Sequence, residues 1–425
     1  MKTTALRIYG KKDLRLETFE LPPLQEDELL VKFISDSLCM SSYKAAVRGA
    51  EHKRVPDDVA QNPTILGHEF CGEIVEVGAK WQGQYKPGQR FILQTAMKET
   101  FYAIGYSYPN VGGNSTYGIV PGFVVAGGYV IPYDGDAWFY GSLTEPLSCV
   151  VGASHANYHT IMGEYTHVME TVEGGKIAAM AAVGPMGLAL LDYLIHRDRK
   201  PALLVVTDID ENRLARASEI LTVEDAAKNG VKLVYLNTSK LEDPAATLME
   251  ISGGTGYDDA FVFVPVTPVV ELADAVLGYD GCLNFFAGPS DEEFSAKLNF
   301  YDVHYNATHI VGTSGGNTDD MREALALAAK GRINPAILVT HVGGLDAAKD
   351  ATLNLPSIPG GKKLIYTHIS LPLTAIVDFA EKGKTDPLFA ELDRLCTLSG
   401  GLWNPEAEQY LLANAPRLDA EEYVV

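Results

Sequence analysis

Short apolar segments separated by turn residues fill roughly the first 150 residues of the chain. Their β-branched, aromatic and aliphatic side chains, bounded by Gly, Pro and Asp, are typical of short strands. The strands that we expect are residues 5–10, 29–35, 71–78, 90–94 and 127–132. By contrast, residues 107–128 are rich in Gly, Tyr and Ser and predict a long loop with little core.

A different pattern begins at Lys176, where apolar runs alternate with amphipathic segments. Buried strands are expected at 176–184, 203–208, 232–237, 257–266, 282–288 and 309–314, and helices at 186–197 and 211–220. Strands that alternate with helices indicate a parallel sheet covered by helices, which is the doubly wound α/β class. We expect this sheet to end near Gly315.

After the expected sheet, residues 319–333 predict an amphipathic helix whose apolar face holds Met321, Leu325 and Ala328. Further strands are expected at 334–342 and 362–369, and the last 55 residues, 371–425, have a mostly helical pattern. We therefore predict two domains. Residues 153–315 form the doubly wound domain, and residues 1–152 with 316–425 form a β-rich domain with a helical C-terminal extension.

The charge of the chain limits its partners. Its 425 residues carry 34 Lys and Arg against 55 Asp and Glu, so the formal net charge is −21. Such a surface repels phosphate backbones and anionic bilayers, so neither nucleic acid nor membrane is an expected partner. An anionic small substrate would need a local basic patch to overcome this field.

The cysteines and the N-terminal segment indicate a reduced cytoplasmic protein. The five cysteines are widely spaced and form no C-x-x-C pair, which disfavours a disulfide framework. Because the first residues contain no apolar signal core, we do not expect secretion. The longest apolar stretch, 177–195, has Gly184-Pro185 near its middle, which favours a buried strand turning into a helix over a membrane span.

A glycine turn, AVGPMG at 182–187, follows the first expected parallel strand. In the dinucleotide fingerprint G-x-G-x-x-G, glycines permit a tight turn, close approach to pyrophosphate and helix–strand packing. Ala182 replaces the first glycine, whereas Gly184 and Gly187 keep the other two places. Pro185 and Met186 begin the helix, whose free N–H groups and dipole favour a pyrophosphate.

An acidic residue follows at the position where the adenosine ribose is recognised. Asp208 ends the second strand, 21 residues after Gly187, where a carboxylate would accept the ribose hydroxyls. It would also repel a 2′-phosphate, so NAD(H) is favoured over NADP(H), although Arg213 could partly offset this repulsion. The alternative is that Asp208 caps a helix or closes a turn.

Four residues with metal-binding side chains are candidates for a catalytic site: Cys39, His68, Glu69 and Glu145. A catalytic zinc uses three or four N, S and O ligands and keeps one place for water or substrate. Cys39, His68 and either glutamate supply such a set. Each has a plainer alternative, because a lone Cys is often a buried hydrophobe and Glu145 could begin a helix.

The segment GHEFCGEIVEVG, residues 67–78, closely resembles the G-H-E-x-x-G-x-V-x-x-V-G signature of zinc-dependent medium-chain alcohol and polyol dehydrogenases. The glycine turn, EPLS at 145–148 and the stretch 312–335 follow in the order of that family, and the resemblance covers about residues 1–370. EPLS resembles the sorbitol dehydrogenase branch. The segments 1–17, 37–44 and 52–63 further resemble the L-sorbose-1-phosphate reductases of the family.

The resemblance implies a GroES-like β-rich catalytic domain beside a Rossmann NAD-binding domain. It implies that Cys39, His68 and Glu145 are zinc ligands, with Glu69 an alternating or water-linked ligand. The structural zinc site of the family, four close cysteines, has no counterpart in 98–128, so one zinc per subunit is expected. The final 55 residues are longer than the usual family ending, and core extension or subunit contact in a dimer or tetramer is the default expectation.

The same resemblance gives two residues a role in proton transfer. Ser41 stands where the family has a hydroxyl that bonds the substrate oxygen. Lys44 stands where the family often has a relay histidine, so Lys44 could relay the proton or bind an anion.

A basic cluster lies soon after Cys39 and consists of Lys44, Arg48, His52, Lys53 and Arg54. It could be a solvated surface, as Lys and Arg commonly are. It could also be a clamp for a phosphate monoester, because Arg presents forked donors and Lys a point charge.

We therefore expect a zinc- and NAD(H)-dependent oxidoreductase acting on a sugar or polyol phosphate, with L-sorbose 1-phosphate reduced to D-glucitol 6-phosphate. One alternative is a dehydrogenase of an unphosphorylated polyol or secondary alcohol, in which the basic cluster is surface. A second alternative is an NAD-binding protein without turnover. The complete set of ligand-type residues disfavours this last reading.

Overall fold

The computed structural model describes residues 1–423, which fold as two compact units. Unit 1 combines Met1–Glu145 with Pro335–Val425, and unit 2 is Pro146–Asn334. Val424 and Val425, the end of the expected helical extension, lie outside the described residues. The domain boundaries expected at 152/153 and 315/316 stay a prediction, while the compact units divide at other bonds of the chain.

Unit 1 is built on an eight-stranded sheet with the order β19-β17-β18-β3-β5-β6-β8, and β7 pairs with β3 beside this path. The pairs β3–β5, β5–β6 and β18–β3 are antiparallel. The bounds are β3 Leu29–Ser37, β5 Phe70–Val77, β6 Arg90–Leu93, β7 Tyr117–Val120, β8 Val130–Pro132, β17 Val339–Gly344, β18 Lys362–Tyr366 and β19 Thr374–Ala375.

A second, three-stranded sheet and several short helices complete unit 1. The sheet has the order β2-β1-β4, with β1 Lys2–Gly10, β2 Asp13–Glu20 and β4 Thr64–Ile65. The helices are α1 Met40–Arg48, α2 Gly122–Ala126, α3 Trp138–Ser142, α12 Ala348–Leu353, α13 Phe379–Lys382, α14 Pro387–Leu398 and α15 Pro405–Asn414. Helix α4, Thr144–Ala156, begins at the end of the first part of unit 1 and continues into unit 2.

The expectation of a long loop with little core at 107–128 is wrong. This segment contains β7 and α2, and Val111, Val120, Val124 and Val125 are almost fully buried against the core that includes Phe33. Valines among the glycines and tyrosines therefore supply a packed face.

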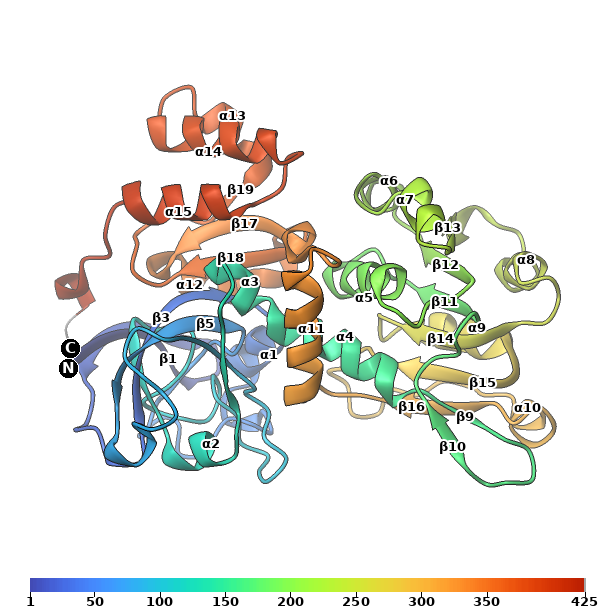
Figure 1. Cartoon of the computed structure of the whole chain (residues 1–425), viewed down its shortest axis with the longest axis horizontal. Helices are drawn as coiled ribbons and strands as arrows, with labels where there is room; N and C mark the ends of the chain where they lie inside the picture. The colour runs from blue at the N-terminus through green and yellow to red at the C-terminus, as the bar shows by residue number, and fades with distance from the viewer. Residues whose placement is uncertain (424–425) are drawn as a thin grey trace. The chain divides into compact units, whose positions relative to one another are not determined.

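Unit 2 holds the predicted doubly wound sheet, which is parallel throughout (Figure 1). Its order is β13-β12-β11-β14-β15-β16. The bounds are β11 Lys176–Met180, β12 Leu203–Asp208, β13 Lys232–Asn237, β14 Tyr257–Val262, β15 Leu277–Phe285 and β16 His309–Gly312. β11 and β14 form its centre, and β11 and its neighbour β12 are buried at every position except Lys176, as expected for a sheet covered on both faces.

The helices of unit 2 include the two expected after β11 and β12. They are α5 Pro185–His196, α6 Glu211–Ile220, α7 Val223–Lys228, α8 Pro244–Ile251, α9 Thr267–Ala275, α10 Phe300–Tyr305 and α11 Thr318–Ala329. A hairpin of β9 Tyr158–Thr160 and β10 His167–Met169 was not expected from the sequence.

Helix α11 forms as predicted, but its buried face is rotated. Met321, Ala324 and Leu327 are buried, whereas Leu325 and Ala328 are only partly buried. The buried face therefore contains Ala324 and Leu327, at three and six residues after Met321. Leu325, four residues after Met321, lies at the margin of that face.

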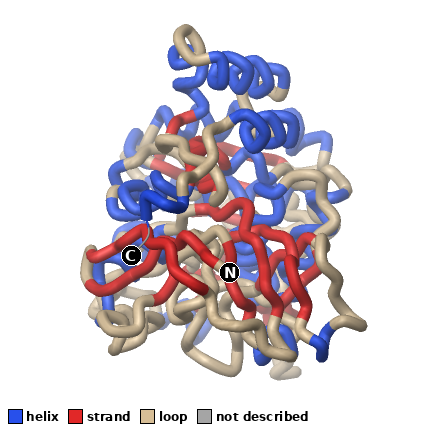
Figure 2. Tube along the Cα trace, turned by 90° about the vertical axis from the view of Figure 1, so that its left-hand side faces the viewer, coloured by secondary structure: helices blue, strands red, loops and turns tan. Residues whose placement is uncertain are grey.

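The C-terminal helices are part of the core of unit 1. Phe389, Leu392, Trp403 and Leu411 are buried in one cluster with residues of β17, β18 and α3. Helices α13, α14 and α15 lie beside β17 at one end of the sheet, and the view in Figure 2 shows them stacked above the strands of unit 1 (Figures 1 and 2). Within residues 1–423, no helix has the length and apolar character needed to cross a bilayer.

Candidate metal centre and nucleotide turn

The register of two strands brings three of the predicted metal ligands together. β3 and β5 are antiparallel with Asp36 opposite Phe70, so the end of β3 lies beside the start of β5. Cys39 follows β3 and His68 and Glu69 precede β5. Their ligand atoms all lie within 4.8 Å of one another. Among the described residues this is the one group of three or more such side chains that is close enough to hold a metal ion.

His68 is buried and held at both ring nitrogens. Ser42 Oγ lies 3.2 Å from Nδ1, and the hydroxyl of Tyr106 lies 3.1 Å from Nε2. Burial lowers the pKa of His68 to about 4, so the imidazole is neutral near pH 7. A neutral imidazole is the form that binds a metal.

Glu69 forms a buried ion pair. Lys362 Nζ, from the first residue of β18, lies 2.5 and 2.6 Å from the two carboxylate oxygens, and both side chains are almost fully buried. Although burial acts to raise the pKa of Glu69, the ammonium of Lys362 holds it below its usual value. As a metal ligand, Glu69 would have to share its oxygens with Lys362, and its predicted ligand role stays a prediction.

The donor set around Cys39 fits a zinc ion. Burial raises the pKa of the Cys39 thiol to about 12, and the carboxylates of Glu69 and Glu145 act in the same direction. A thiolate at this place therefore needs a cation as its partner. Sulfur, nitrogen and carboxylate oxygen are the donors that zinc takes, so these three side chains would fit the ion.

Glu145 lies near this group without joining it at ligand distance. It is the second residue of α4 and is mostly buried, and its charge influences Cys39, Tyr106 and Lys362. The cluster of three ligand atoms does not include it. Its role as a ligand stays a prediction, and its place in the first turn of a helix matches the plainer alternative as well.

Tyr106 and Lys362 belong to the site and were missed by the sequence analysis. The ring of Tyr106 lies against His68 and is stacked on His52 at 5.9 Å between ring centroids. Tyr106 lies in a stretch rich in tyrosine, and Lys362 is 293 residues from its partner Glu69. No spacing in the sequence identifies either residue.

Ser41 and Lys44 lie on the first turns of α1, directly after Cys39. The Cys39 thiol donates to Ser41 Oγ at 3.6 Å, so the hydroxyl is at the metal group. Lys44 is partly buried, and burial lowers its pKa. The contact places Ser41 at the candidate ligand group, while the proposed roles of Ser41 and Lys44 stay predictions.

The basic cluster has members in different surroundings. The Arg54 guanidinium lies over the ring of Tyr106 at 5.3 Å, whereas Lys53 is exposed and Arg48 is partly buried at the end of α1. His52 does not supply a positive charge, because burial and the neighbouring cations, Arg54 first among them, lower its pKa to about 4. The place of His52 in the basic cluster therefore stays a prediction, with a neutral imidazole beside the cations.

The glycine turn in unit 2 has the geometry of a phosphate-binding turn. Gly184 caps α5 and Pro185 is its first residue, followed by Met186. A Cβ on Gly187 would lie 2.0 Å from the carbonyl oxygen of Ala182, so the helix approaches the strand too closely for any other residue. The absent first glycine thus leaves the packing role of Gly187 intact.

Asp208 and Arg213 lie at the same edge of the sheet as this turn. β11 and β12 are parallel neighbours, so the turn after β11 and the last residue of β12 meet at their carboxyl ends. Asp208 Oδ1 accepts hydrogen bonds from the N–H groups of the next two residues, at 2.8 and 3.0 Å. Arg213 Nη2 lies 3.0 Å from the place that a Cβ on Gly184 would take.

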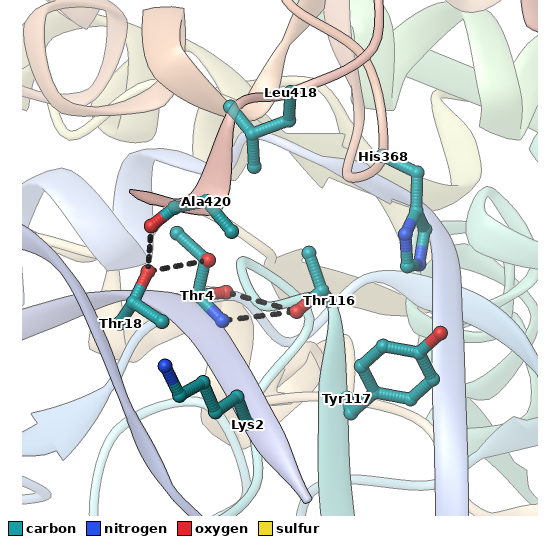
Figure 3. Close-up of a pocket in the computed structure, with 8 residues that line it drawn as sticks. All are labelled: Lys2, Thr4, Thr18, Thr116, Tyr117, His368, Leu418 and Ala420. Carbon is teal, nitrogen blue, oxygen red and sulfur yellow. Dashed lines mark hydrogen bonds between the residues drawn. The ribbon is translucent and has the colours of Figure 1, made fainter. Parts of the chain in front are cut away.

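A cavity of about 150 Å³ lies elsewhere in unit 1, between β1, β2 and the C-terminal segment (Figure 3). Its hydroxyls are engaged within the protein: those of Thr4 and Thr18 lie 2.7 Å apart, and Thr18 donates to the carbonyl oxygen of Ala420 at 2.8 Å. Thr116 Oγ1 accepts from the N–H of Thr4. The side chains that line this cavity include none of the predicted site residues, so we assign it no role in catalysis.

Comparison with known families and proteins matches both units. A model described as an alcohol dehydrogenase GroES-like domain matches residues 25–131, and one described as a zinc-binding dehydrogenase matches 185–330. The chain is 53% identical to mannitol-1-phosphate 5-dehydrogenase of Aliivibrio fischeri over 412 residues, which cover 97% of each chain. It is 50% identical to L-sorbose 1-phosphate reductase of Klebsiella pneumoniae over 415 residues, covering 97% of this chain and 98% of that one.

A solved structure shares the fold. The crystal structure of 2R,3R-butanediol dehydrogenase from Bacillus subtilis superposes with a TM-score of 0.70 at 21% identity. The match covers 86% of this chain and 99% of that one.

Proposed function

This chain belongs to the zinc-binding alcohol dehydrogenase family, and from that premise we propose that it transfers hydride between NAD(H) and a sugar or polyol phosphate. The reaction that we favour is reduction of L-sorbose 1-phosphate to D-glucitol 6-phosphate. One observation supports the phosphate: in a chain of net charge −21, Arg54 lies over the ring of Tyr106, whose hydroxyl reaches His68, and Lys44 lies on α1, which begins directly after Cys39. The two relatives at 50% and 53% identity are both named for sugar or polyol phosphates.

Cys39, His68 and Glu145 would hold one catalytic zinc per subunit. Glu69, which is paired with Lys362, would be an alternating or water-linked ligand. Bound zinc would polarise the substrate carbonyl and stabilise the developing alkoxide charge. Ser41 would hydrogen-bond the same oxygen and pass it a proton. Burial lowers the pKa of Lys44, which is the direction that a group resupplying that proton requires.

The substrate proposal is tested by NADH oxidation with L-sorbose 1-phosphate and with L-sorbose, on zinc-replete and chelator-treated protein. We expect turnover of the phosphate ester alone, and only with zinc. Equal turnover of L-sorbose, which has no phosphate, would favour the alternative dehydrogenase of unphosphorylated polyols, in which the basic cluster is surface. Binding of NADH without any turnover would favour the NAD-binding protein without activity.

NAD(H) rather than NADP(H) is the proposed cofactor, because Asp208 would face the adenosine ribose. Replacing Asp208 by Asn keeps an acceptor for the two backbone N–H groups and removes only the charge. We expect the preference for NADH over NADPH to fall by at least about tenfold, since like charges placed together cost several kcal/mol. The measurement is the ratio of kcat/KM for the two cofactors.

The control for this variant is Glu211→Gln, which removes an exposed carboxylate at the start of α6. It should leave the cofactor ratio unchanged. An unchanged ratio in Asp208→Asn as well would mean that the residue only closes the turn.

A second copy of the chain is the proposed partner. β16 is the edge strand of its sheet, and exposed apolar side chains lie on it and on the neighbouring α10: Phe300, Tyr301, Tyr305 and Ile310. Exposed patches of this kind mark interaction surfaces. A sedimentation mass of one subunit at micromolar concentration would contradict the proposed homo-oligomer.

A further inference from the structure

The C-terminal segment places a buried carboxylate against α3, the short helix just before Glu145. Glu408, on α15, is only 2% exposed. Its Oε2 accepts from the N–H of Trp138 at 2.6 Å, and its Oε1 accepts from the N–H of Phe139 at 2.8 Å. These are the first N–H groups of α3, whose own cap residue, Ala137, has no side chain that can accept them. The Glu408 side chain thus caps the N-terminus of a helix that lies about 270 residues earlier in the chain.

The same carboxylate also holds β18. The hydroxyl of Tyr366, the last residue of β18, donates to Glu408 Oε1 at 2.8 Å and accepts from Trp403 Nε1 at 2.8 Å. Burial raises the pKa of Glu408 to about 7, and these donors together with Arg90 oppose that shift. The group is therefore placed where its charge is costly and where every oxygen has a donor.

The other end of α3 is fastened to β3. Ser142 Oγ contacts the Ser35 hydroxyl and donates to the Ser35 carbonyl oxygen at 3.0 Å. Ser35 stands opposite Tyr366 in the β3–β18 register. The contacts therefore connect Glu408 to α3, α3 to β3, β3 to β18, and β18 back to Glu408. Glu408 is the one residue of α15 in this set.

Three elements of this set lie next to residues at or near the metal centre. β3 leads to Cys39, β18 begins with Lys362 and so with the partner of Glu69, and α3 runs through Leu143 into α4 and Glu145. Helix α3 also packs closely on β5, because a Cβ on Gly141 would lie 2.4 Å from Cys71 Sγ. The spacing of the candidate ligands thus depends on how α3 and β18 are held.

We propose that Glu408 is a positioning residue of the metal centre, through which the C-terminal extension sets the spacing of Cys39, Glu145 and Lys362. This inference rests on the proposed zinc site. It gives the final helices a role in the reaction as well as in the core.

The test is zinc retention in Glu408→Gln, at a temperature where the variant is folded. A Gln amide would present its NH₂ group to one of the two backbone N–H donors and so break that half of the cap. We expect zinc to leave for a chelator about tenfold faster, in the range for residues that orient metal ligands. We also expect a shifted visible spectrum of the cobalt-substituted protein and an unchanged affinity for NADH. Glu406→Gln, an exposed change on the same helix, is the matched control and should match the wild type.

Tyr366→Phe provides a milder variant, since it removes one donor and keeps the ring. Its zinc release should fall between those of the wild type and Glu408→Gln. If both variants unfold at lower temperature but keep wild-type zinc release and cobalt spectrum, Glu408 only stabilises the core and the inference is wrong. If the wild type itself holds no zinc, the proposed function fails with it, so the two failures are distinct.

Discussion

Replacing His68 by Ala is expected to lower kcat/KM by about a thousandfold or more, equivalent to roughly 4 kcal/mol of transition-state stabilisation. The reason is that His68 is the neutral nitrogen donor at the centre of the group, between Cys39 and the hydroxyl of Tyr106. Without the imidazole, the proposed zinc loses one of its ligands. The Cys39 thiol, whose pKa burial raises, then has no bound cation to stabilise its thiolate. The measurements are steady-state kinetics and zinc content of the purified variant.

His304→Ala is the matched control, because His304 is exposed on α10 in unit 2. It should keep full activity and full zinc. If His68→Ala kept both zinc and most of the activity, the metal would have to lie elsewhere, and the assignment of the site would be wrong.

The parallel sheet was predictable because its inner strands are largely buried and appear as continuous apolar runs. The expected runs 203–208 and 232–237 match β12 and β13 residue by residue, whereas the run 176–184 extends past the end of β11 at Met180. Packing choices were not predictable in the same way. The apolar residues of α11 allow two rows, and only the neighbouring elements decide that Ala324 and Leu327 are buried and Leu325 is not.

The candidate site was predictable as far as it is local. His68 and Glu69 are adjacent, and the resemblance supplied Cys39 as their partner. Lys362 and Glu408 could not be found, because their partners lie about 290 and 270 residues away and no pattern joins them.

Charge states were a further limit of the sequence. His52 looks like a cation among Lys44, Lys53 and Arg54. Burial and those same neighbours make it neutral, and burial is a property of the fold.

Lys44 and Arg54 are the members of the basic cluster that we expect to recognise a phosphate. Arg54 lies over Tyr106, whose hydroxyl reaches His68, and Lys44 lies on α1 five residues after Cys39. Lys53 has the same charge as Lys44 and follows His52 directly, but its side chain is exposed. Substituting these three residues one at a time therefore distinguishes a phosphate clamp at the metal group from a general attraction of anions to the surface.

Arg54→Ala is expected to raise KM for L-sorbose 1-phosphate by about 10- to 100-fold, since a hydrogen bond to a charged group contributes roughly 1.5–3 kcal/mol. Arg54→Ala should not create turnover of L-sorbose, because that sugar has no phosphate and the guanidinium is not what excludes it. Lys44→Ala should raise the same KM and also lower kcat if it resupplies the proton, whereas Lys53→Ala should change KM less than twofold. Equal small effects of all three changes, abolished by salt, would indicate surface attraction alone, since exposed charges are screened at 0.15 M salt. In that case the phosphate would have to be bound by other residues, and the unphosphorylated polyol would become the better substrate hypothesis.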